Sequence, residues 1–140
     1  MDDSLHYLLM ADHTLFQKLL FSGIRDTSLT LGQPKVLDYL SEHNGAIQKE
    51  IAFGCHIEHA SLTSVLNGME KKGLIKREMQ NGNRRSQYVY MTEKGRNLSE
   101  IIKHQFEKIE EDALNGFSED EVQQLIEYLK KIYINLYNGK

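Results

Sequence analysis

The sequence has one cysteine and one proline in 140 residues, and no apolar run of membrane-spanning length. Cys55 alone cannot form an intramolecular disulfide, and such sparse use of cysteine is typical of a reducing compartment. A transmembrane helix needs about 20 predominantly apolar residues. The start MDDSLHYLLMADH also lacks the basic segment of a secretory signal. These absences predict a cytoplasmic protein.

The patterns of common enzyme and metal sites are missing as well. No glycine-rich phosphate loop follows a predicted strand, and no Ser/His/Asp or Cys/His arrangement or paired carboxylates are implied. The segment CHIEH contains metal-ligand residue types, but Cys55 and His56 are adjacent and the segment crosses a predicted turn. We therefore predict no catalytic residues, no metal and no cofactor, and we interpret Cys55 as a small buried residue.

The composition, 40% hydrophobic and 26% charged, suits one folded domain. The net charge of −3 by itself argues against a nucleic-acid partner. The distribution of the charges along the chain is more informative. Residues 59–96 hold eight Lys/Arg and three Asp/Glu, a net +5, whereas residues 1–58 and 97–140 each carry −4. Because local charge sets the attraction to phosphate, the central segment is the candidate nucleic-acid surface.

Hydrophobic spacing predicts helices in the first half of the chain. Residues 4–23 repeat apolar groups at i, i+3 and i+4. A capping box from Thr30 to Gln33, with Pro34 in the first turn, predicts a second helix. Residues 46–55 and 59–72 suit two short helices joined by a tight turn, which is the helix-turn-helix pattern.

A hairpin and two further helices complete the pattern. Asn81-Gly82 is a strong hairpin turn between strands at 74–79 and 86–91. A long helix follows to about residue 115, and Ser118 opens the last one with a capping box. The predicted fold is mainly α with a small β-hairpin: a winged helix-turn-helix lobe at 30–96 within one domain, 1–140. The flanking helices at 1–29 and 97–140 exceed what so small a core needs, which predicts dimerisation.

Three stretches, QKEIA, ASLTSVLNGMEKKGLIKR and NRRSQYVYMTEKGRNL, resemble the MarR (multiple antibiotic resistance regulator) family of bacterial transcription factors. The resemblance implies a homodimer that binds pseudo-palindromic operator DNA, usually represses, and is usually released by a small molecule or by oxidation. This chain departs from the family pattern at Asn83, where an acidic residue usually precedes the wing arginines. It also has Ser64 and Gly68 where the recognition helix often carries arginine.

The helical face opposite the predicted core residues Leu62, Val65, Leu66 and Met69 supplies the candidate DNA contacts. Small polar side chains let a helix enter a major groove, and an asparagine can pair with adenine. Adjacent arginines at the hairpin tip can reach a minor groove or the backbone. The first residues of the preceding helix can hold a phosphate. The predicted set is Gln48, Lys49, His59, Ala60, Ser61, Thr63, Ser64, Asn67, Asn83, Arg84, Arg85 and Gln87.

Other basic residues, among them Lys72, Lys76 and Arg77, are interpreted as surface or phosphate-steering charge. By family analogy, a small apolar or aromatic effector is expected near Met10, His13, Phe16 and Tyr39. Two alternatives stay open: a winged helix that contacts only proteins, and a regulator that senses oxidation through Cys55.

Overall fold

Short polar turns divide this chain into the expected helices and hairpin, as a computed structural model shows for residues 2–79 and 87–139. The chain forms two compact units, Met1–Glu107 and Lys108–Lys140, and each is described by itself. Helix α5 (Glu93–Ala113) continues from the first unit into the second. The mainly helical fold with a small antiparallel sheet confirms the predicted winged helix-turn-helix class.

The first unit opens with α1 (Leu5–Gly23), a 3-10 turn (Arg25–Thr27) and α2 (Gln33–Glu42). Pro34 lies in the first turn of α2, as predicted. The predicted capping box forms only in part, because Gly32 is the N-cap and Thr30 is not. Gln33 Oε1 does accept from the Thr30 backbone N–H at 3.0 Å. Gly32 adopts φ 89°, a left-handed conformation that glycine supplies without strain.

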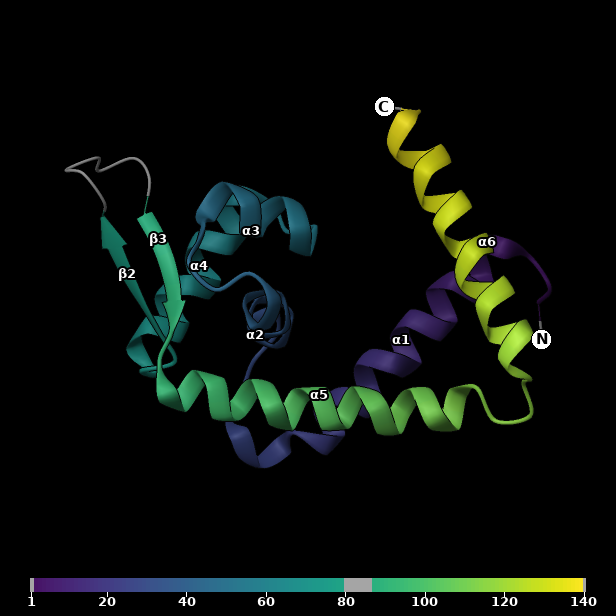
Figure 1. Cartoon of the computed structure of the whole chain (residues 1–140), viewed down its shortest axis with the longest axis horizontal. Helices are drawn as coiled ribbons and strands as arrows, with labels where there is room; N and C mark the ends of the chain where they lie inside the picture. The colour runs from purple at the N-terminus through teal and green to yellow at the C-terminus, as the bar shows by residue number, and fades with distance from the viewer. Residues whose placement is uncertain (1, 80–86, 140) are drawn as a thin grey trace. The chain divides into compact units, whose positions relative to one another are not determined.

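The helix-turn-helix consists of α3 (Gln48–Cys55) and α4 (His59–Lys71). These helices pack on α2, while α4 also contacts β2 (Ile75–Met79) (Figure 1). The helix predicted over residues 46–55 was wrong at its start, because Ala46–Ile47 is a strand, β1. Two residues are too few for a strand period to be visible in the sequence.

The sheet has the order β1–β3–β2 and is antiparallel throughout. Strand β3 (Gln87–Met91) lies between its neighbours, with Val89 opposite Ala46 on one side and Arg77 on the other. The core beneath it is formed by fully buried aliphatic side chains from α2, α3, α4 and α5: Val36, Leu37, Leu40, Ile51, Leu62, Leu66, Met69 and Ile102.

The second unit contains the end of α5 and the helix α6 (Glu119–Asn138). Ser118 caps α6 as predicted: its hydroxyl accepts from the Glu121 N–H at 3.1 Å, and Glu121 accepts from the Ser118 N–H at 2.9 Å. No residue of α6 is buried. Its apolar residues therefore remain available to another surface.

Candidate nucleic-acid interface

Helix α4 presents a polar face to solvent. Leu62, Leu66 and Met69 are fully buried, which fixes the rotation of the helix, and Val65 is half-buried above Gly32. The opposite side exposes the side chains predicted to contact DNA: His59, Ala60, Ser61, Thr63, Ser64 and Asn67. Small hydroxyl and amide groups on a protruding helix can approach base edges or phosphates.

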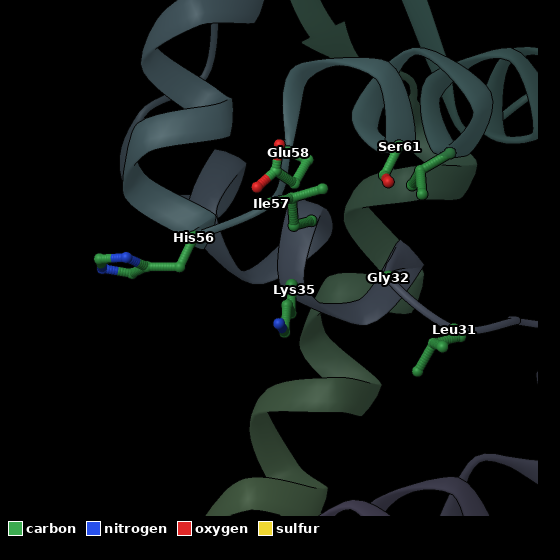
Figure 2. Close-up of a pocket in the computed structure, with 8 residues that line it drawn as sticks. Leu31, Gly32, Lys35, His56, Ile57, Glu58 and Ser61 are labelled. Atoms are coloured by element: carbon green, nitrogen blue, oxygen red, sulfur yellow. The ribbon is translucent and has the colours of Figure 1, made fainter.

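The turn between α3 and α4 is closed by a left-handed residue. His56 has φ 53°, and the Ile57 N–H donates to the Ala52 carbonyl at 3.0 Å, as in the usual end of a helix. Beside this turn lies a surface hollow of about 320 Å³. Figure 2 labels seven of the residues that line it, and Val65 is the eighth: Leu31, Gly32, Lys35, His56, Ile57, Glu58, Ser61 and Val65.

A side-chain hydrogen bond ties α3 to the exposed face of α4. Gln48 Nε2 donates to Thr63 Oγ1 at 2.7 Å, and Thr63 Oγ1 donates in turn to the His59 carbonyl at 3.1 Å. The hydroxyl proton of Thr63 is therefore already used in a hydrogen bond within α4. Gln48, predicted as a phosphate contact, is placed by this bond to orient α4, while Lys49 beside it is exposed.

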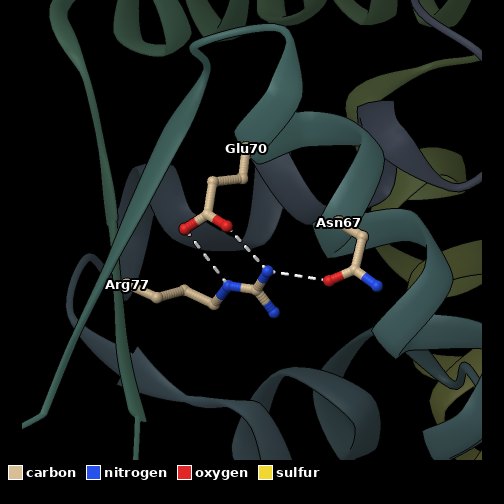
Figure 3. Close-up of polar contacts among 3 residues, drawn as sticks. All are labelled: Asn67, Glu70 and Arg77. Atoms are coloured by element: carbon tan, nitrogen blue, oxygen red, sulfur yellow. Dashed lines mark hydrogen bonds and ion pairs between the residues drawn. The ribbon is translucent and has the colours of Figure 1, made fainter.

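Arg77 on β2 joins the hairpin to the same helix (Figure 3). Its Nη2 donates to Asn67 Oδ1 at 2.7 Å and to Glu70 Oε1 at 2.9 Å, and its Nε donates to Glu70 Oε2 at 3.4 Å. The Arg77 side chain is only 14% exposed. The hydrogen bonds from Arg77 hold the pKa of the Glu70 carboxyl below its usual value.

These contacts correct the interpretation of Arg77 and Lys72 as surface or phosphate-steering charge. Arg77 is bound as described, and Lys72 Nζ donates to Gln33 Oε1 at 2.8 Å and to the Ser28 carbonyl. Lys76 pairs with Glu78 at 3.1 Å, although both side chains are well exposed. Sequence reasoning missed the positioning roles of Gln33, Glu70 and Arg77. Helical spacing shows which face a residue occupies, but it does not show which strand residue crosses that face.

The remaining predicted DNA contacts belong to the hairpin. Gln87 begins β3 opposite Met79 and is half-buried. The predictions for Asn83, Arg84 and Arg85 concern positions outside the described residues.

The residues predicted for an effector lie on α1 and α2. Met10 and His13 are exposed on α1, and Phe16 is half-buried. Tyr39, on α2, stacks on His43 with ring centroids 4.4 Å apart and lies against Gly54 of α3. None of these residues lines the hollow beside His56.

Comparison with known proteins agrees with this architecture. Residues 29–87 match the MarR family. The transcriptional regulator SlyA superposes with a TM-score of 0.87 at 29% identity, covering 99% of this chain and 96% of that one. A MarR family regulator from Listeria monocytogenes, solved with 26mer DNA, superposes with a TM-score of 0.88 at 27% identity, covering 99% and 92%. Residues 29–87 are therefore assigned to the MarR family, and the chain has the fold of MarR-family transcriptional regulators.

A curated relative is similar in sequence as well. The HTH-type transcriptional regulator YybA of Bacillus subtilis is 25% identical over 112 residues, which span 80% of this chain and 75% of YybA. The described helices include none with the length and apolar character needed to cross a bilayer.

The single thiol of the chain is turned inward. Cys55 is 8% exposed, and its Sγ donates to the Lys35 carbonyl at 3.5 Å. Burial raises the pKa of the Cys55 thiol to about 11. Since the thiolate is the reactive form, this environment disfavours the oxidation-sensing alternative. Across residues 2–79 and 87–139, no cluster of three His, Cys, Asp or Glu side chains is arranged to bind a metal.

Proposed function

We propose that this protein is a MarR-family regulator that represses transcription by binding a pseudo-palindromic operator as a homodimer in the cytoplasm, and that a small effector releases it. The observation that carries the proposal is the exposed polar face of α4. That face is held in place by hydrogen bonds from Gln48 of α3 and from Arg77 of β2. A helix that reads bases needs its side chains held in fixed positions, because base recognition depends on where each donor and acceptor lies.

Charge supports DNA as the partner. Residues 59–96, which include α4 and both hairpin strands, carry a net +5. Ser61 and Ser64 can donate to or accept from the DNA, and Ala60 can meet a thymine methyl group. The Listeria relative of the same fold was crystallised with a 26mer DNA. In our proposal α4 enters the major groove, and Arg84 and Arg85 contact the flanking DNA.

The dimer proposal rests on apolar residues that the chain leaves uncovered. In α1, five large apolar side chains are 41–60% exposed: Leu5, Leu9, Met10, Leu15 and Leu19. In α6, seven are 42–66% exposed: Ile126, Tyr128, Leu129, Tyr133, Ile134, Leu136 and Tyr137. A helix with so much exposed apolar surface is stable when a partner buries it. A second copy of the chain would do so with self-complementary faces.

The effector proposal keeps a small apolar or aromatic molecule near Met10, His13, Phe16 and Tyr39. Its support is the combination of aromatic rings with an exposed methionine, which is 54% accessible. Such a ligand would release DNA by binding more tightly to a conformation whose α4 helices no longer match the operator. A ligand screen that never changed operator affinity would contradict this part alone.

The test of DNA binding is fluorescence anisotropy on a duplex from upstream of the protein's own gene, titrated with salt and with random competitor DNA. We expect binding that survives the competitor. Arg85→Ala should weaken it and lower the salt slope by roughly one, if that arginine contacts a phosphate. The matched control is Lys131→Ala on α6, which should change neither quantity. Weak binding that random DNA fully displaces would contradict the proposal.

The test of the dimer is sedimentation of Leu136→Glu. Leu136 is 66% exposed in the single chain, so the change should leave the fold intact. If the residue is buried twice in a symmetric dimer, the dissociation constant should rise at least about 100-fold, from about 1.5 kcal/mol or more per leucine. Gln123→Glu, an exposed polar position on the same helix, is the control. Equal dissociation constants would argue against α6 as the interface.

A further inference from the structure

The orientation of one amide on α4 determines which bases it can read. Asn67 is exposed on the polar face of the helix, one turn beyond Thr63 and Ser64. Its Oδ1 accepts from Arg77 Nη2 at 2.7 Å. Figure 3 shows the amide nitrogen of Asn67 directed away from the guanidinium.

Chemistry fixes this orientation. A guanidinium has only N–H donors and no acceptor, so the amide atom that faces it must be the oxygen. The guanidinium is itself held by two hydrogen bonds to Glu70, at 2.9 and 3.4 Å. Its strand position is set by the pairing of Arg77 with buried Val89. Rotation of the amide by a half-turn would place its NH₂ group against the Arg77 cation.

An asparagine held in this way presents its amide NH₂ group, a hydrogen-bond donor, to an approaching partner. The usual asparagine–adenine pair needs both the amide oxygen, for adenine N6–H, and the amide nitrogen, for adenine N7. Arg77 occupies one lone pair of Asn67 Oδ1 and holds that oxygen toward β2, so the acceptor half of that pair is turned away from the side that the NH₂ group presents. An NH₂ group can donate to O6 and N7 of guanine or to O4 of thymine. On adenine it meets the N7 acceptor beside the N6–H donor, and on cytosine it meets only the N4–H donor.

We propose that Asn67 selects a keto base, guanine or thymine, and disfavours the amino bases adenine and cytosine at its operator position. This replaces the adenine contact expected from the residue type alone. Arg77 is the positioning residue, since it acts through Asn67 and need not touch the base. The inference rests on the proposed DNA-binding function and deepens it.

The experiment is selection of binding sites from a random duplex library with the intact protein and three variants. We expect the motif selected by the parent protein to contain two symmetry-related positions at which guanine or thymine is preferred. In Asn67→Ala this preference should disappear. The affinity should fall about 5-fold for each of the two contacts, near the lower end for a specific base contact. Asn67→Asp, which offers only acceptors, should shift the same positions toward adenine and cytosine. Arg77→Gln supplies both a donor and an acceptor, so it should admit adenine there while other positions stay unchanged.

A change confined to one symmetric pair of positions separates this role from general damage to the fold, which would weaken every position alike. Thermal melting of each variant checks folding independently. Enrichment of adenine by the parent at the position that depends on Asn67 would overturn the inference and leave the proposed function intact. A motif unchanged in Asn67→Ala would overturn it as well. Absence of any specific motif for the parent would overturn both.

Discussion

The approach of α5 to the hairpin gives a prediction whose size can be worked out. Gly95, in the first turns of α5, is buried against the residue that precedes β2. A Cβ atom added there would lie 2.1 Å from the Leu74 carbonyl oxygen and 3.1 Å from the Leu74 carbonyl carbon. The same oxygen accepts from the Thr92 N–H at 3.0 Å. Alanine at this position therefore requires a backbone shift of about 1 Å, in the range where overpacking becomes costly.

Three terms set the magnitude of Gly95→Ala. Overpacking costs about 1–3 kcal/mol. Weakening the Thr92–Leu74 hydrogen bond adds about 1 kcal/mol, whereas alanine gains about 0.5–1 kcal/mol in a helix. The net loss is about 2 kcal/mol, which lowers the melting temperature by roughly 6–8 °C for a chain of this size.

The assay is thermal unfolding followed by circular dichroism at one fixed protein concentration, because the proposed dimerisation would couple stability to concentration. Gly73→Ala is the matched control: Gly73 has φ 75°, and no atom lies within 4 Å of its added Cβ. That variant should lose only the cost of a left-handed alanine, about 1 kcal/mol. If Gly95→Ala melted at or above the parent temperature, as helix propensity alone would have it, the close approach of α5 to Leu74 would be refuted.

Three further predictions follow from the site. Gln48→Ala removes the hydrogen bond to Thr63 and should weaken operator affinity about 3- to 10-fold. The dependence of affinity on salt concentration should stay the same, and a weaker dependence would show that Gln48 contacts phosphate directly. The lowered pKa of Glu70 means that its contribution to stability is present above the unfolded carboxyl pKa and is lost as pH falls through the folded value. Glu70→Gln should therefore flatten the acid side of a plot of melting temperature against pH, and a parallel plot would argue against the Arg77 pair. With its pKa raised to about 11, Cys55 should react slowly with a disulfide reagent at neutral pH and quickly in urea, so fast native labelling would revive a redox role.

Most of the fold was predictable because it follows from local patterns. The capping box at Ser118 and the spacing of Leu62, Leu66 and Met69 each depend on residues within one or two helical turns. The strand Ala46–Ile47 was not predictable, since it exists only through its pairing with β3. The same limit explains the N-cap of α2, where Gly32 is required by its left-handed backbone and by the nearby Val65 side chain.

The sequence by itself determined which face of α4 is polar, where the basic segment lies, and that the first and last helices carry more apolar surface than one small core can bury. Each of these is a property of spacing or composition along one segment. Only the tertiary structure decided what the polar residues do on that face. Gln48 and Arg77 come 15 residues before Thr63 and 10 residues after Asn67 in the chain. Folding brings each of them next to its partner, because a hydrogen bond forms between groups that are close in space, whatever their separation in the sequence.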